Sequence, residues 1–150
     1  SAPEECYLAL RGLRTLRVRL DRHRQTAHAL CEWLKGRSEV TRILYPALPE
    51  DPGHAIWKRD FTGAPGLFSF ILKDRSKKAI AAMLDGMKLL AIGYSWGGYE
   101  SLTLPIYPET IRTATTWKEG PAIRIHAGLE DPDDLIQDLD EGFKRLNAAG

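Results

Sequence analysis

The sequence has few cysteines and no long apolar run. Its two cysteines, Cys6 and Cys31, fall within one predicted helix, too far apart along it for a disulfide bond. Reduced thiols are typical of the cytoplasm. No apolar stretch approaches the ~20 residues that span a bilayer, and the amino terminus lacks the charged-then-apolar order of a secretory signal. We therefore expect a soluble, cytoplasmic protein.

Common catalytic and metal-binding motifs are also missing. The histidines are scattered and lack zinc-binding spacing, so no metal site is predicted: they are His23, His28, His54 and His126. We interpret His23, on the apolar stripe of the first helix, as a packed or interface residue. The glycines of the 93–98 segment match neither a Walker loop nor a dinucleotide-binding pattern. Ser95 has no neighbouring base to activate it.

The sequence has little net charge, but its charges are unevenly distributed along the chain. A net charge of +1 provides no general field for attracting nucleic acid or an acidic membrane. Six arginines nevertheless crowd residues 11–24, and residues 130–141 hold seven acids and no base. Solvated helix faces explain such segregation, and so does an interaction domain whose basic helix docks on an acidic partner.

Hydrophobic periodicity and turn residues predict a single α+β domain over residues 1–150, with a small, mostly antiparallel sheet and helices on one face. A long helix leads, from about residue 4 to residue 34. Pro105 and Pro108 place strand 102–106 at a sheet edge. The other predicted elements are strands 40–45, 66–73, 87–92 and 122–127, helices 54–61 and 77–84, and a closing helix capped by Asp131.

Arg124 is the first candidate functional residue, because it lies in the middle of an apolar strand. A guanidinium there requires a carboxylate partner, since its fork of donors matches a carboxylate and an unpaired buried charge is costly. That partner is either an internal acid, Glu100 or Glu130, or a small carboxylate ligand. Trp96, directly before Gly97 and Gly98, is a candidate for the rim of such a site.

Three motifs together resemble the carboxy-terminal domain of the Cys/Met-metabolism enzymes that use pyridoxal 5'-phosphate. They are the glycine-bearing segment 93–102, the segment 123–136 around Arg124, and the opening segment 10–16. The resemblance covers nearly the whole chain. Tyr94-Ser95-Trp96 is most similar to the cystathionine β-lyase branch, which converts cystathionine to homocysteine, pyruvate and ammonia in methionine biosynthesis.

The resemblance implies a role for each matching residue. Arg124 is expected to clamp the substrate α-carboxylate, Ser95 and Trp96 to help hold it, and Tyr94 to tune which leaving group is accepted. It also implies the small domain of a fold type I transferase that forms homotetramers.

The same resemblance implies what this chain lacks. The family's larger amino-terminal domain carries the Schiff-base lysine and most cofactor contacts, and neither Lys88 nor Lys118 matches that lysine. We therefore expect no catalytic residue in this chain, and an isolated chain without activity. The alternatives are a γ-lyase or γ-synthase of the same family, a free-standing amino-acid-binding module and an interaction domain.

Overall fold

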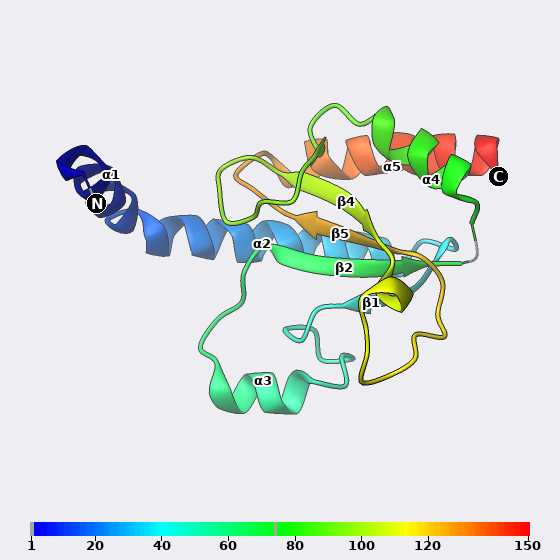
Figure 1. Cartoon of the computed structure of the whole chain (residues 1–150), viewed down its shortest axis with the longest axis horizontal. Helices are drawn as coiled ribbons and strands as arrows, with labels where there is room; N and C mark the ends of the chain where they lie inside the picture. Colours follow the sequence, from blue (N-terminus) through cyan, green and yellow to red (C-terminus); the bar gives the residue numbers. More distant parts are fainter. Residues whose placement is uncertain (1, 74) are drawn as a thin grey trace.

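The computed structural model describes residues 2–73 and 75–150, and it is an α+β domain as predicted (Figure 1). Five strands form one sheet in the order β1-β2-β5-β4-β3, with β3 and β4 parallel and the other neighbours antiparallel. The elements are α1 (Pro3–Leu13), α2 (Leu16–Lys35), β1 (Val40–Leu44), α3 (His54–Asp60), β2 (Leu67–Leu72), α4 (Lys77–Asp85), β3 (Ala91–Ile92), β4 (Leu102–Ile106), η1 (Pro108–Thr110), β5 (Ala122–His126) and α5 (Pro132–Ala149).

The core lies between one face of the sheet and helices α2, α4 and α5. Alternation along the two central strands sends Phe68 and Phe70 of β2, with Ile123 and Ile125 of β5, to this face. The three helices contribute buried apolar residues to the same cluster. Because side chains alternate, Arg124 falls on the opposite face of β5.

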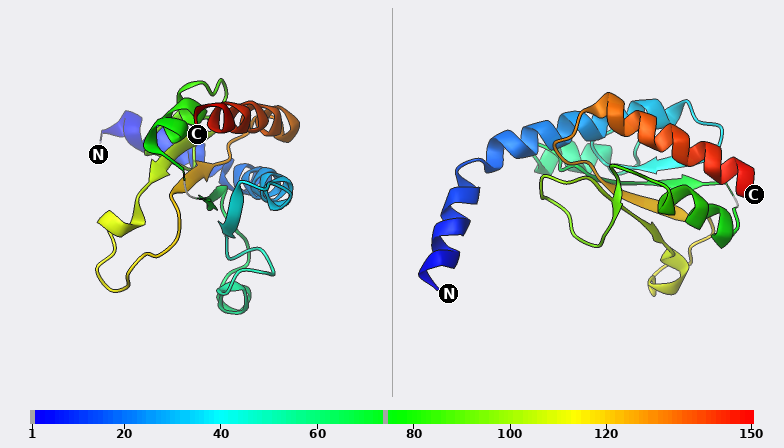
Figure 2. Two further views of the ribbon diagram at one scale, coloured as in Figure 1. Left: turned by 90° about the vertical axis from the view of Figure 1, so that its right-hand side faces the viewer. Right: turned by 90° about the horizontal axis from the view of Figure 1, so that it is seen from above.

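The prediction of one continuous first helix is wrong in one respect. In the structure this segment is divided into α1 and α2 at residues 14 and 15 (Figure 2). The carbonyl of Gly12 accepts from the backbone amide and the hydroxyl of Thr15, and Nη2 of Arg19 donates to it at 2.8 Å. These bonds replace the helical pairing at a residue of low helix propensity. Helix α1 then departs from the axis of α2 and buries no residue.

The strand predicted at 87–92 is shorter than expected. Only Ala91 and Ile92 pair with β4, because the carboxylate of Asp138 in α5 accepts the amides of Lys88, Leu89 and Leu90 at 2.8–3.1 Å. Those amides are no longer free to form a ladder.

The edge position predicted for β4 is also wrong. Strand β4 lies between β5 and β3, but β3 pairs only with Leu102 and Thr103, so Pro105 lies beyond the pairing. A proline without an N–H is tolerated there. The predicted caps of the later helices are present: the side chains of Ser76 and Asp131 accept amide hydrogen bonds at the start of α4 and α5.

Both cysteines are free, with Cys6 exposed and Cys31 buried. Burial raises the pKa of the Cys31 thiol far above its usual value, so this thiol stays protonated. Within the described residues, no helix combines the length and apolar composition that crossing a bilayer requires.

Candidate functional site

Arg124 lies at the centre of β5, on the side of the sheet away from α2, α4 and α5. Its Cα pairs with those of Ser69 in β2 and Leu104 in β4, so strands flank it on both sides. The side chain is half-buried. Two flanking strands hold its backbone, which makes this a rigid position from which to present a charged group.

The guanidinium contacts the segment that follows β3. Nη2 of Arg124 donates to the carbonyl oxygen of Tyr94 at 2.5 Å, and the carbonyl oxygens of Gly93 and Ser95 lie at 3.4 Å. Among the residues that the structure describes, Nε and Nη1 bond to no protein atom, and no ion pair includes Arg124. Within the described residues, carbonyl dipoles and no carboxylate contact the positive charge of Arg124.

Neither acid considered as an internal partner pairs with Arg124 within the described ranges. Glu130 accepts from the amide of Ser101 at 2.8 Å and from its hydroxyl at 2.7 Å. The hydroxyl oxygen of Ser101 in turn accepts from the amide of Gly128 at 2.8 Å. Glu100 is exposed and forms no ion pair there. Within the described residues neither acid is therefore the partner of Arg124, and an external carboxylate stays a prediction.

We call residues 93–101 the tryptophan loop. Its course follows from sheet topology: because β3 and β4 run parallel, the loop must return the chain to the end where β3 began. It starts beyond Ile92, which pairs with Thr103, and ends before Leu102, which pairs with both Ala91 and His126. The loop therefore passes first the level of Arg124 and then that of His126.

The side chains of the tryptophan loop are largely exposed. Tyr94 is 85% exposed, Trp96 58% and Tyr99 68%. The structure brings Tyr94 and Ser95 to Arg124 through their backbone carbonyls, whereas the Ser95 hydroxyl and the Trp96 indole nitrogen bond to no described residue. The substrate-binding roles expected for these residues and for Arg124 stay predictions.

Sequence reasoning missed the contribution of His126. Its ring is 1% exposed, and Nε2 lies 3.1 Å from both the amide nitrogen of Gly97 and the carbonyl oxygen of Gly98. Spacing could have found it, because residues two apart on a strand share a face, and Arg124 and His126 are two apart. His126 instead counted only as one of four scattered histidines.

His23 of α2 packs edge-on against His126, with ring centroids 5.0 Å apart. Its side chain is 1% exposed, and neither ring nitrogen has a hydrogen-bond partner of acceptable geometry among the described residues. Burial lowers the pKa of His23, and His126 and Arg19 lower it further, against opposing contributions from Glu130 and the Gly98 carbonyl. Burial also lowers the pKa of His126, with Arg124 adding to the effect. His23 is thus packed, as the sequence indicated.

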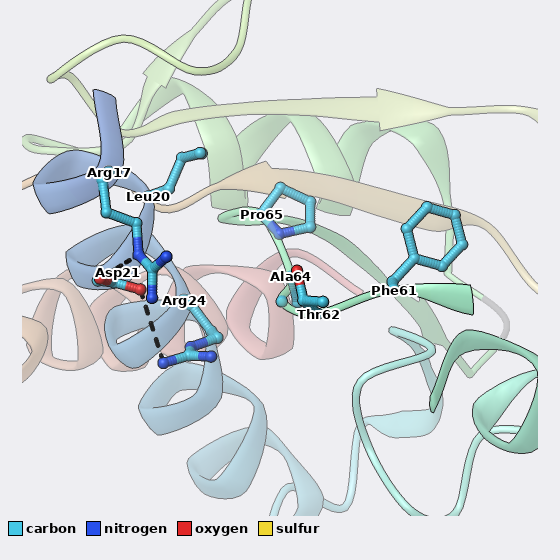
Figure 3. A pocket seen from close by; sticks show the side chains of 9 residues that line it. Arg17, Leu20, Asp21, Arg24, Phe61, Thr62, Ala64 and Pro65 are labelled. Carbon is cyan, nitrogen blue, oxygen red and sulfur yellow. Dashed lines mark hydrogen bonds and ion pairs between the residues drawn. The ribbon is translucent and has the colours of Figure 1, made fainter. Parts of the chain in front are cut away.

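A separate hollow of about 370 Å³ lies between α2 and residues 61–65 (Figure 3). Arg17 and Arg24 reach into it, but both pair with Asp21, at 2.8 Å and 3.7 Å. One carboxylate shared by two exposed guanidiniums leaves no buried unpaired group. This hollow shares no lining residue with the Arg124 site, and Arg124 remains the better candidate.

Comparison with known proteins gives one consistent family. The model of the Cys/Met metabolism PLP-dependent enzymes matches residues 1–144. A cystathionine β-lyase of Escherichia coli is 49% identical over 95% of this chain. An L-alanine/L-glutamate racemase of Wolbachia pipientis is 46% identical, also over 95% of the chain. The chain spans 38% of the length of the first relative and 36% of the second.

Solved structures agree with the sequence comparison. A cystathionine γ-synthase of Xanthomonas oryzae pv. oryzae, determined in complex with cystathionine, superposes with a TM-score of 0.85 and 33% identity. The match covers all of this chain and 40% of that one. The domain is that of a fold type I enzyme. The chain belongs to the family of Cys/Met metabolism enzymes that depend on pyridoxal phosphate.

Proposed function

We propose that this chain is the small domain of a pyridoxal phosphate-dependent carbon–sulfur β-lyase and that Arg124 binds the α-carboxylate of a sulfur amino acid such as cystathionine. The observation that carries the proposal is a half-buried guanidinium without an acid partner among the described residues, bonded to the backbone of the loop that carries the exposed Ser95 and Trp96. Similarity to the β-lyase of Escherichia coli supports the β-type reaction.

A carboxylate that binds Arg124 through two parallel bonds must use Nη2, which already donates to the loop. Both edges of a guanidinium that bind a carboxylate through two parallel bonds include Nη2. In Arg124 this atom now donates to the Tyr94 carbonyl. An incoming carboxylate therefore shares or replaces that carbonyl, so ligand binding is coupled to the start of the tryptophan loop.

Positioning is the contribution of this domain to the reaction. A carboxylate fixed on Arg124, with the Ser95 hydroxyl and the Trp96 indole N–H as further donors, sets the rotation of the substrate about its α-carbon. That rotation selects which bond to the α-carbon is weakened. Tyr94, 85% exposed at the start of the loop, is placed to contact the leaving group. Pyridoxal phosphate, when bound, supplies the electron sink.

The residues described here fit the substrate and not the cofactor. A phosphate cradle requires converging N–H groups, whereas the loop presents three carbonyl oxygens at Arg124. Neither Lys88 nor Lys118 matches the cofactor lysine of the family. We therefore propose that a larger domain supplies this lysine, and that the full-length protein is a cytoplasmic homotetramer.

Two other reactions share this site chemistry. A γ-lyase or γ-synthase uses the same carboxylate clamp, and the Xanthomonas structure has the same domain fold. A racemase also needs the substrate's α-carboxylate fixed, and one relative with that name is 46% identical. These reactions differ in what happens beyond the α-carbon, so the clamp alone does not distinguish them.

Product analysis distinguishes the three reactions. The coding region upstream of residue 1 should be recovered and the full-length protein expressed and incubated with cystathionine. We expect pyruvate and homocysteine, whereas 2-oxobutyrate and cysteine identify γ-cleavage. Inversion of alanine or glutamate, followed by chiral chromatography, identifies racemisation. A cofactor-loaded protein that cleaves no carbon–sulfur bond would overturn the proposal.

A further inference from the structure

We propose that His126 is a positioning residue of the carboxylate site, because its imidazole fixes the Gly97–Gly98 turn on β5 and so sets Trp96 beside Arg124. The effect on substrate binding rests on the proposed function. The effect on the loop itself does not, because it follows from the contacts within this chain.

One face of β5 holds the tryptophan loop at two points. Arg124 bonds to the carbonyls of residues 93–95, and His126, two residues along β5 on the same face, bonds to Gly97 and Gly98. Trp96 lies between the two attachments. Trp96 therefore belongs to a short segment whose backbone is fixed on both sides, although its side chain is 58% exposed.

A neutral ring accommodates both loop residues. With its proton on Nε2, His126 donates to the Gly98 carbonyl at 3.1 Å. The Gly97 amide lies 3.1 Å from Nε2 and 3.4 Å from Nδ1, so it approaches the face of the ring and not the lone pair of one nitrogen. Gly97 has a φ of +84°, a conformation that other residues rarely adopt. The imidazole of His126 thus fixes the backbone at Gly97, where the loop turns.

Helix α2 also contacts this turn and the ring that holds it. Arg19 donates from Nη1 to the Gly97 carbonyl at 3.4 Å and from Nη2 to the Gly12 carbonyl at 2.8 Å. His23, one helical turn further along, packs edge-on against the ring of His126. These contacts keep the imidazole in one orientation and connect the turn to the junction between α1 and α2.

Loss of His126 would loosen the turn between the two attachments. The Gly97–Gly98 turn would then be held by the 3.4 Å contact from Arg19, while Arg124 would share its Nη2 between the loop carbonyls and a bound carboxylate. The Trp96 segment would then have to be ordered by the substrate itself, and that lost entropy weakens binding. The expected signature is a raised KM with a much smaller change in kcat.

The test compares three variants of the full-length enzyme: His126→Ala, His126→Gln and, as a control, His54→Ala on the exposed helix α3. For His126→Ala we expect KM for cystathionine to rise about tenfold, the range for one or two lost hydrogen bonds, with kcat changed less than about threefold. Hydrogen exchange of the peptide spanning residues 93–101 should accelerate. His126→Gln, which keeps a donor and an acceptor, should restore part of both effects, and His54→Ala should show neither.

Unchanged KM and unchanged exchange in folded His126→Ala would overturn the proposal. If that variant does not fold, His126→Gln decides instead, and wild-type values for both quantities overturn it. Failure of the proposed function looks different: Arg124→Lys would leave KM unchanged, while His126→Ala would still accelerate exchange of the loop.

Discussion

Glu130 and Ser101 form a closed pair: the carboxylate accepts from both the amide and the hydroxyl of the serine, at 2.8 Å and 2.7 Å. Ser101 is fully buried, and its oxygen also receives the amide of Gly128. The pair joins the end of the tryptophan loop to the turn after β5. These bonds also occupy Glu130, one of the two acids considered as an internal partner of Arg124.

Replacing Ser101 by alanine should destabilise the protein. The change removes a donor to Glu130 and leaves the buried amide of Gly128 without its acceptor, at a cost of about 1–3 kcal/mol. The free energy of unfolding in urea measures the effect. Thr116→Ala, at an exposed position on the 107–121 connection, is the matched control and should change it by less than about 0.5 kcal/mol. Equal stability of both variants would show that the pair contributes nothing.

Asp138→Asn tests the reason for the short β3. One carboxylate oxygen, Oδ2, accepts from all three amides of residues 88–90, and Oδ1 also accepts from the amide of Lys88. Asparagine keeps one acceptor oxygen but loses the charge, and its NH2 group would face these N–H donors. We expect a loss of about 2–3 kcal/mol in the free energy of unfolding. Glu141→Gln, in an exposed ion pair on the same helix, should cost less than about 1 kcal/mol. A neutral Asp138→Asn would contradict this account.

Arg124→Lys in the full-length enzyme tests the clamp. A lysine cannot make two parallel bonds to a carboxylate, so KM should rise strongly. We expect kcat/KM to fall by two or more orders of magnitude, on the order of 3 kcal/mol. Arg112→Lys, at an exposed position, is the control and should leave the kinetics unchanged. Wild-type kinetics in Arg124→Lys would remove Arg124 from the site.

Stability should fall as the pH falls below the usual pKa of histidine, 6.5. Burial lowers the folded-state pKa of His23 and of His126 below that value, so in this window the unfolded chain binds more protons. Stability contributed by the neutral rings is therefore complete above pH 6.5 and is lost as the pH drops through the lowered pKa values. The charged groups that act on the pair are Arg19, Arg124 and Glu130.

Urea unfolding between pH 8 and pH 5 measures this slope. His23→Phe, which keeps an edge-on ring without a titrating nitrogen, should flatten it. His28→Gln, at an exposed position of the same helix, should not. The same slope in all three proteins would assign the pH dependence to other groups.

Local patterns in the sequence predicted most elements because their causes are local. The caps of α4 and α5 depend on Ser76 and Asp131, each bonded within three residues. The shortening of β3 came from a contact between residues far apart in the chain, because Asp138 lies about 50 residues away in sequence. The break before α2 depends on nearer residues, Thr15 and Arg19, which bond to the Gly12 carbonyl, and apolar periodicity does not report such polar contacts.

The site was predictable in part for the same reason. Arg124 stood out as a charge within an apolar strand, and the glycines beside Trp96 marked a loop that approaches another surface. Apolar patterning carries no information on which loop atoms the guanidinium contacts, so its bonds to the Gly93, Tyr94 and Ser95 carbonyls were not foreseen. The spacing of Arg124 and His126 on one strand indicates a shared face, but the parallel pairing of β3 that brings the loop to His126 involves only two residues and gives no periodic signal.

Helix α1 has 11 residues and buries none of them, and Tyr7, Leu8 and Leu13 are each more than 60% exposed. So short a helix is marginal in water unless another surface covers its apolar side. The hydrogen exchange of α1 should therefore depend on whether a binding partner covers it. Backbone amides of residues 6–13 should exchange rapidly in the chain alone and slowly once a partner is bound. The segment that opens this domain would thus be the last part of it to become ordered.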